Sequence, residues 1–239
     1  MIRVILWDVD GTLLDFKASE KTALDAAFRR FGLGRCDEAR IARYSVLNDR
    51  WWKALEREEV TKAQLLTGRF KEFFSAEGLA FAGDYGAFND YYQIMLGETV
   101  VFRDGGDRLV ADLRDRVSQY AVTNGTLAAQ SRKLKNSGLD KVLEGAFISE
   151  EIGAEKPSPV FFDAVFAAIG PVERDQILLV GDSLTSDMKG GNNAGIRCCW
   201  YDPAWREPPA HLNIAYHIRD LNEVRGILER ENGRLAGPV

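Results

Sequence analysis

The feature that most limits the fold of this chain is a short, largely apolar run that recurs along the sequence and stops each time at polar residues. Such runs span residues 2–7, 117–122 and 176–180. Short apolar runs bounded by turn residues are typical of buried parallel strands. Weaker runs of the same kind occur at residues 145–148, 197–201 and 215–218. The sequence therefore predicts a sheet built mostly of parallel strands.

Segments with helical periodicity separate these runs. They cover residues 107–115, 127–137, 159–169, 187–194 and 222–231. Strands that alternate with helices predict an α/β fold, in which helices cover both faces of a parallel sheet.

One long stretch does not follow this alternation. Between residues 16 and 97 the pattern predicts four successive amphipathic helices, near 19–31, 38–58, 62–77 and 86–96, with Thr61 as the N-cap of the third. We interpret this block as an inserted all-helical subdomain. The predicted division is a core of residues 1–15 and 98–239 and a helical cap of residues 16–97. The tail from residue 232 to 239 is expected to fray.

Composition excludes several classes of protein. The chain has 239 residues with 31 basic and 36 acidic side chains, a net charge of -5. This balance disfavours a general nucleic-acid binder, but it permits a local basic pocket for a small phosphorylated metabolite. Three cysteines form a poor disulfide framework and fit a reducing cytosol; Cys198-Cys199 is expected to pack inside the protein.

No part of the sequence approaches the ~18–20 apolar residues that span a bilayer. The first apolar run, residues 4–7, is too short for a signal-peptide core. We therefore expect a cytoplasmic protein with no membrane partner, either a monomer or a homodimer.

Polar side chains from distant parts of the sequence are expected to meet at one edge of the sheet. The carboxyl ends of parallel strands share an edge, and ligands bind there in open α/β sheets. The candidates that follow strands, or lie in turns beside them, are Asp8, Asp10, Thr123, Asn124, Lys156, Asp182 and Asp187.

This set of side chains suits metal-assisted phosphate chemistry. Carboxylates close together raise one another's pKa unless a cation lies among them, and an all-oxygen set suits Mg²⁺. A hydroxyl, a backbone N–H turn and an ammonium suit phosphate oxygens. Asp8 would be the nucleophile. Asp10, on the same side of an extended chain, would protonate the leaving oxygen and later deprotonate water. A structural cation site without chemistry is the alternative.

The sequence resembles the haloacid dehalogenase-like (HAD) superfamily of aspartate-nucleophile phosphatases. Asp8-Val9-Asp10-Gly11-Thr12 matches the DxDGT motif of that family, and three further motifs follow in order. These contain Thr123, Lys156-Pro157 and Gly181-Asp182-Ser183 with Asp187. The match extends from residue 1 to about 202. The resemblance implies a Rossmann-like core with a helical cap inserted after the first motif, and a Mg²⁺-dependent phosphatase.

The resemblance also implies a role for each acidic residue. Asp8 would form the aspartyl-phosphate and Asp10 would act as the acid/base. Mg²⁺ would be held by Asp8, the backbone carbonyl of Asp10, and Asp182. Asp187 would belong to the metal site, where it would contact the metal directly or orient Lys156 and a metal-bound water.

Phosphate binding is implied for three other residues. Thr123, the adjacent Asn124 and Lys156 would bind the substrate, and Lys156 would also restrain the Asp8 charge. One departure from the family is Asp104-Gly105-Gly106, where many relatives carry Pro-Gly-Ala. This turn touches no catalytic motif.

A narrower resemblance points to the pyrimidine 5'-nucleotidase subgroup. It depends on residues 14–17, 19–20, 23–24, 52–56, 60–61 and 68–70. It predicts pyrimidine nucleoside 5'-monophosphates as substrates. Candidate contacts in the cap, whose orientation the sequence does not give, are Phe16, Lys17, Asn48, Trp51, Trp52 and Arg69.

Other functions stay open at this point. A sugar-phosphate or phosphoglycolate-type phosphatase, or a phosphosugar mutase, would use the same motifs. A haloacid dehalogenase is disfavoured because it needs no acid such as Asp10. A non-catalytic phosphate-binding module is disfavoured by the complete set of catalytic residues. A dinucleotide-binding dehydrogenase would need a Gly-x-Gly-x-x-Gly motif after the first strand, which is absent.

Overall fold

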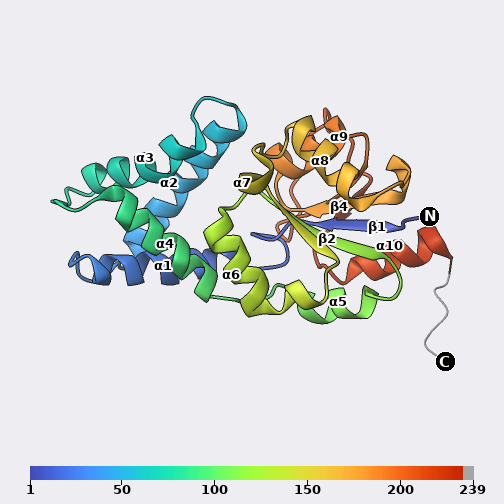
Figure 1. Ribbon diagram of the computed structural model, residues 1–239, viewed down its shortest axis with the longest axis horizontal. Helices are drawn as coiled ribbons and strands as arrows, with labels where there is room; N and C mark the ends of the chain where they lie inside the picture. The colour runs from blue at the N-terminus through green and yellow to red at the C-terminus, as the bar shows by residue number, and fades with distance from the viewer. Residues whose placement is uncertain (234–239) are drawn as a thin grey trace. The chain divides into compact units, whose positions relative to one another are not determined.

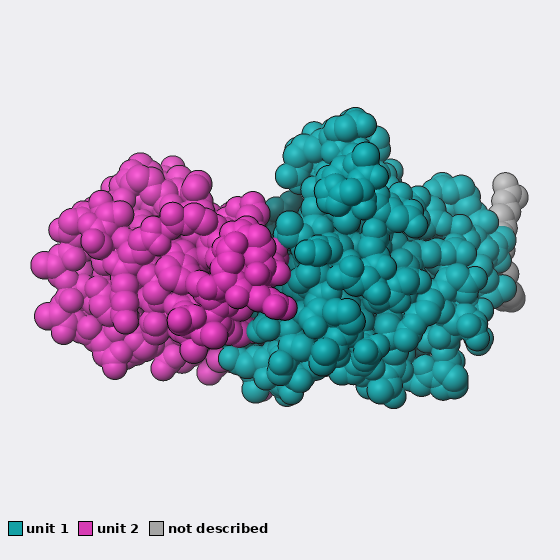
Figure 2. Space-filling model, turned by 90° about the horizontal axis from the view of Figure 1, so that it is seen from above, with its two compact units in different colours: residues 1–15, 102–127, 137–239 teal, residues 16–101, 128–136 magenta. Residues whose placement is uncertain are grey.

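The computed structural model describes residues 1–233, which form two compact units (Figures 1 and 2). The sheet unit comprises Met1–Asp15, Phe102–Leu127 and the chain from Ser137 onward, and the helical unit comprises Phe16–Val101 and Ala128–Asn136. This differs from the division expected from the sequence, which placed residues 98–101 and 128–136 with the sheet. The reason is local bonding: Asn136 Nδ2 donates to the Gly97 carbonyl at 3.0 Å and Arg132 pairs with Glu98 at 3.2 Å.

The sheet unit confirms the predicted α/β fold. Its six strands are all parallel and lie in the order β3-β2-β1-β4-β5-β6. They are β1 (Val4–Trp7), β2 (Ser118–Thr123), β3 (Gly145–Ile148), β4 (Ile177–Gly181), β5 (Arg197–Tyr201) and β6 (Tyr216–Ile218). All six strands coincide with the apolar runs of the sequence. The central strands β1 and β4 are wholly buried, which is why they are continuous apolar runs rather than alternating ones.

Helices cover both faces of the sheet, as Figure 1 shows: α8 (Pro159–Ile169) and α9 (Lys189–Asn193) lie on one face, and α5 (Gly106–Leu113) and α10 (Glu223–Asn232) on the other.

Two short elements differ from prediction. The helix expected at 187–194 begins with a π-helical turn, Leu184–Met188, before α9. The short helix α7 (Ser149–Ile152) follows β3 directly and was not predicted.

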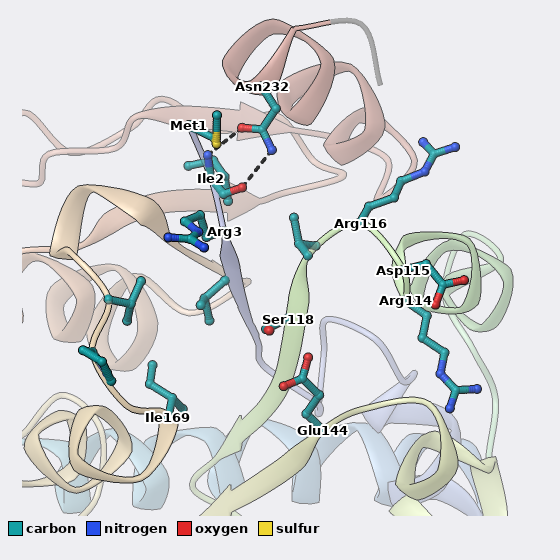
Figure 3. Close-up of a pocket in the computed structure, with 14 residues that line it drawn as sticks. Met1, Ile2, Arg3, Arg114, Asp115, Arg116, Ser118, Glu144, Ile169 and Asn232 are labelled. Atoms are coloured by element: carbon teal, nitrogen blue, oxygen red, sulfur yellow. Dashed lines mark hydrogen bonds between the residues drawn. The ribbon is translucent and has the colours of Figure 1, made fainter. Parts of the chain in front are cut away.

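The end of α10 is tied to the first strand rather than frayed. The Asn232 side chain accepts from Ile2 N at 2.6 Å and donates to Ile2 O at 2.8 Å, as Figure 3 shows. The expectation that residue 232 frays is therefore wrong, because its amide satisfies both backbone groups of Ile2. The rest of that expectation, for residues 234–239, lies outside the described residues.

The helical unit contains α1 (Phe16–Arg30), α2 (Glu38–Glu56), α3 (Lys62–Ala76) and α4 (Tyr85–Glu98), together with most of α6 (Leu127–Ser137). Thr61 is the N-cap of α3, as predicted, and forms a capping box with Gln64. The core of the unit is a cluster of aromatic rings packed mainly edge to face. Its largest buried members are Phe28, Tyr44, Phe70, Phe73, Phe74, Phe88 and Tyr92.

Two further expectations can be compared with the structure. Cys198 and Cys199 lie on β5 and are buried, which confirms their packing role. Within residues 1–233, no helix combines the length and the apolar character that crossing a membrane requires.

Candidate active site

The site lies where the strand order of the sheet reverses. Asp8 directly follows β1 and Asp182 directly follows β4, and these two strands are neighbours although more than 170 residues separate them. The Asp8 amide donates to Val180 O at 2.9 Å, so the sheet ladder itself holds the Asp8 backbone. Thr123 is the last residue of β2, on the other side of β1. Ligand crevices in open α/β sheets form at this kind of switch point.

Lys156 joins the acidic residues into one buried network. Its Nζ donates to Asp8 Oδ1 at 2.8 Å, to Asp187 Oδ1 at 2.7 Å and to the Val122 carbonyl at 2.9 Å. The side chain is 1% exposed. Burial acts to lower the pKa of Lys156, but Asp187 and Asp8 outweigh it and raise that pKa. The ammonium therefore stays charged between two carboxylates.

The three carboxylates crowd one another. Asp8, Asp182 and Asp187 each offer an oxygen, and these oxygens all lie within 4.8 Å of one another. Burial, followed by the Asp187 charge, raises the pKa of Asp8 well above its usual range and raises the pKa of Asp182 to about 7. One ammonium does not balance three carboxylates. A divalent cation among them would favour their ionised forms.

The donor set fits a hard cation such as Mg²⁺. Among residues 1–233, the buried Asp8 Oδ2 has no hydrogen-bond partner, although Oδ1 is held by Lys156. A buried carboxylate oxygen without a partner is costly, so it indicates a ligand. Asp182 Oδ1 accepts a long bond from Thr12 Oγ1, 3.3 Å. In Asp187 both oxygens are bonded to the protein: Oδ1 to Lys156 and Oδ2 to the Ser183 amide at 3.1 Å.

Two glycines make room for these carboxylates. Gly11 has φ +100°, and a Cβ there would stand 2.7 Å from Asp182 Oδ2. A Cβ on Gly181 would stand 2.4 Å from the Asp187 carboxyl carbon. Real Cβ atoms do not approach so closely, so side chains at either position would displace a carboxylate. The sequence showed both glycines inside motifs but not the contacts that require them.

Asn124 holds the lysine loop in place. Its Nδ2 donates to Lys156 O at 2.8 Å, and its Oδ1 accepts from Lys156 N at 2.7 Å. This reciprocal pair ties the end of β2 to the turn that carries Lys156. Thr123 is buried, and its Oγ1 accepts from the Gly125 amide at 3.1 Å. Asp10 is partly buried and its side chain is not one of the three clustered carboxylates.

The sequence did not reveal two side chains that contact Asp182. One is Thr12, which lies in the first motif but received no role. The other is Trp200, near the end of β5, whose Nε1 donates to the Asp182 carbonyl at 3.0 Å. No motif signals Trp200, because the contact arises only when β4 and β5 pair.

The candidate contacts in the helical unit differ in environment. Arg69 and Asn48 are buried: Arg69 Nη1 donates to Asn48 Oδ1 at 2.8 Å and Nη2 to Asn89 Oδ1 at 3.0 Å, and Asn48 donates to Glu20 at 2.9 Å. These bonds link α1, α2, α3 and α4, so Asn48 and Arg69 hold the four helices together.

Trp51 and Trp52 are only partly buried, unlike that network. Trp51 Nε1 donates to Glu72 at 2.9 Å, and its ring lies against Gly68.

A separate pocket of about 490 Å³ lies at the opposite, amino-terminal edge of the sheet (Figure 3). Arg114 and Arg116 line it, but Figure 3 shows their side chains pointing away from each other. None of the predicted site residues borders this pocket. Its polar groups do not converge on a common point, in contrast to those around Lys156.

Comparison with known proteins agrees with this geometry. The family model described as "haloacid dehalogenase-like hydrolase" matches residues 2–195. The chain belongs to this HAD-like hydrolase family. The match includes every residue of the candidate site from Asp8 to Asp187.

Similar HAD hydrolases align over nearly the whole chain. The HAD-hydrolase YfnB of Bacillus subtilis is 33% identical over 96% of this chain and 97% of its own length. Pyrimidine 5'-nucleotidase PynA of Streptococcus pneumoniae is 33% identical over 95% of both chains. Pyrimidine 5'-nucleotidase YjjG of Escherichia coli is 30% identical over 94% of this chain and 96% of its own length.

A solved HAD structure is also similar. Crystalline YfnB, bound to magnesium, superposes with a TM-score of 0.87 at 32% identity and covers 95% of this chain and 98% of its own. The recognition of the family from its motifs is thereby confirmed.

Proposed function

We propose that this HAD hydrolase is a Mg²⁺-dependent phosphomonoesterase that acts through an aspartyl-phosphate on Asp8. The observation that carries the proposal is the state of the Asp8 carboxylate. One oxygen is fixed by Lys156, while the other is buried without a partner in the described chain. A carboxylate held in one orientation by a buried ammonium is placed for attack on a phosphorus atom.

Two steps follow from this arrangement. An Asp8 oxygen forms a bond to phosphorus while the bond from phosphorus to the leaving oxygen breaks, and Asp10 gives that oxygen a proton. Water then attacks the aspartyl-phosphate, loses a proton to Asp10, and releases phosphate and the free Asp8 carboxylate. Lys156 stays bonded throughout and offsets the charge of Asp8 and Asp187.

Mg²⁺ would be held by Asp8, Asp182 and the backbone carbonyl of Asp10. When bound, it would offset the negative charge that the carboxylates and the phosphate bring together. Asp187 would orient Lys156 rather than bind the metal directly, since both of its oxygens already accept hydrogen bonds. Thr123 would bind a phosphoryl oxygen, and Asn124 would fix the loop of Lys156.

The proposed substrates are pyrimidine nucleoside 5'-monophosphates. PynA and YjjG, whose names state this activity, align with more than nine-tenths of the chain, helical unit included. Phosphatases named for glyceraldehyde 3-phosphate align with half of the chain or less. A match that includes the helical unit, and not the shared motifs alone, supports the nucleotide.

The nucleophile is tested by Asp8→Asn. We expect turnover of p-nitrophenyl phosphate to disappear while the far-ultraviolet circular dichroism stays unchanged. Asp163→Asn, which changes an exposed carboxylate on α8, is the matched control and should keep full activity. Substantial activity in pure Asp8→Asn protein would refute the covalent mechanism.

The substrate is tested by comparing dUMP and dTMP with dAMP, phosphoglycolate and glucose 6-phosphate at equal Mg²⁺. One stacked base contributes about 1–3 kcal/mol, so the pyrimidine preference in kcat/KM should be about 5- to 150-fold. A higher kcat/KM for phosphoglycolate or the sugar phosphate would reject the nucleotidase and leave the general phosphatase.

A further inference from the structure

A stack of aromatic rings lies at the carboxyl ends of β5 and β6. The His217 ring lies between two indoles, 4.5 Å from Trp200 and 4.1 Å from Trp205, with interplanar angles of 14° and 8°. The outer face of Trp205 is covered by the Arg219 guanidinium at 4.3 Å. His217 and Arg219 thus both stack on Trp205, which is still 47% exposed.

On the other side of His217, the stack contacts the indole of Trp200. This side chain is wholly buried, and β5 pairs Trp200 with Gly181, the last residue of β4. From there Nε1 donates to the Asp182 carbonyl at 3.0 Å. The bond satisfies a carbonyl at the point where the strand ladder stops.

The bonded carbonyl belongs to a peptide group with a second fixed atom. The N–H of the same group, on Ser183, donates to Asp187 Oδ2 at 3.1 Å. A peptide group is planar, so fixing its carbonyl also fixes the direction of its N–H. Trp200 therefore constrains the backbone from which the Asp182 carboxylate projects, and the donor that holds Asp187.

We propose that Trp200 is a positioning residue for the metal site, kept in place by the stack with His217 and Trp205. The inference rests on the proposed function, in which Asp182 is a metal ligand. The buried Asp202 carboxylate lies beside the stack: it accepts from the Arg206 side chain at 2.9 Å and lies 3.7 Å from His217 Nε2. Outer groups that orient metal ligands commonly govern metal affinity.

A second buried tryptophan provides a matched control. Trp7, on β1, is also wholly buried, and its Nε1 donates at the same distance, 3.0 Å, to Gln119 Oε1. Gln119 in turn donates to the Val110 carbonyl on α5. Replacing Trp7 with Phe thus removes an equal ring volume and an equal hydrogen bond without touching the peptide between Asp182 and Ser183.

The experiment compares Trp200→Phe with Trp7→Phe in the full chain. Mg²⁺ affinity is measured by isothermal titration calorimetry, and kcat for p-nitrophenyl phosphate is measured as a function of Mg²⁺. One lost hydrogen bond implies metal binding about 3- to 10-fold weaker in Trp200→Phe, with kcat restored at saturating Mg²⁺. Trp7→Phe should bind the metal as the wild type does.

The outcomes distinguish the positioning role of Trp200 from the proposed function. Unchanged Mg²⁺ affinity in Trp200→Phe, or an equal loss in Trp7→Phe, would overturn the positioning role and leave the proposed function standing. If the wild-type chain neither binds Mg²⁺ nor hydrolyses p-nitrophenyl phosphate, the proposed function is rejected, and this inference with it.

If Trp200→Phe does not fold, His217→Leu tests the same support, because it keeps the indole N–H and removes the flat ring against it. We expect weaker Mg²⁺ binding in that variant, with a loss smaller than the about 3- to 10-fold expected for Trp200→Phe because the hydrogen bond is kept. Unchanged binding would overturn the role of the stack.

Discussion

Replacing Lys156 with methionine would remove the ammonium group that lies between Asp8 and Asp187. Methionine has a similar length and no charge, so the change tests the electrostatics of the site with little change in volume. In the wild type, this ammonium donates three bonds of 2.7–2.9 Å from a position that is 1% exposed. Its loss would leave two carboxylates buried with no cation between them.

The expected loss of folding stability in Lys156→Met follows from this burial. Removing one partner of a buried ion pair costs about 3–5 kcal/mol. For a chain of this length, 1 kcal/mol shifts Tm by about 2–4 °C, so we expect a decrease of roughly 6–20 °C at pH 8 without metal. Burial already raises the pKa of Asp8, and Lys156 opposes that rise. Without Lys156 the buried carboxylates of the folded protein keep protons that the unfolded chain releases. Lowering the pH therefore favours the folded variant, and its decrease in Tm relative to the wild type should become smaller towards pH 5.

The assay is thermal unfolding, followed by circular dichroism in EDTA at pH 8 and at pH 5.5. Lys189→Met, which makes the same change at an exposed lysine just beyond Asp187, is the control and should stay within about 0.5 kcal/mol of the wild type. A Tm for Lys156→Met within about 2 °C of the wild type at pH 8, a shift no larger than surface substitutions produce, would refute the argument. An equal loss at both pH values would show that packing, not charge, is responsible.

Two other predictions follow from the same cluster. MgCl₂ should raise Tm more at pH 8 than at pH 5.5. The pKa of Asp182 is raised to about 7, so its proton stabilises the metal-free fold at low pH, and that stabilisation is lost as pH rises through about 7. Above that pH the ionised carboxylate is free to bind the metal. Equal gains in Tm at the two pH values would contradict this. Gly181→Ala should lower kcat/KM about 10- to 100-fold with the fold retained, because its Cβ would displace the Asp187 carboxylate. Gly145→Ala, whose Cβ would be in ordinary contact with Tyr120 at 3.4 Å, is the control, and an equally small effect of both changes would disprove the steric argument.

Much of the sheet and much of the site could be predicted from the sequence. A strand buried on both faces must be apolar along its whole length, so β1 and β4 are visible as continuous runs. The residues after such strands share one edge, which is why the positions of Asp8 and Asp182 in the sequence suffice to predict that they lie together. Chemistry then restricts the ligand of clustered carboxylates to a hard cation.

Other features depend on contacts between segments that are far apart in the sequence. The tail residue Asn232 shows no ordering signal of its own, because its two partners are backbone groups of Ile2. Asn124 lies in the second motif, but only the fold shows that its amide holds Lys156.

The difference between what the sequence determines and what the tertiary structure decides is clearest around Asp182. Its position after a buried strand is a local property, set by hydrophobic periodicity and turn chemistry, and the sequence determines it. The groups that surround it are not local: Gly11, Thr12 and Trp200 come from other parts of the chain and reach it only when β1 and β5 flank β4. Side-chain identity thus determined which chemistry the chain carries. Strand pairing decided which backbone and indole groups hold that chemistry in place, because close approach is a property of the folded chain and not of residue order.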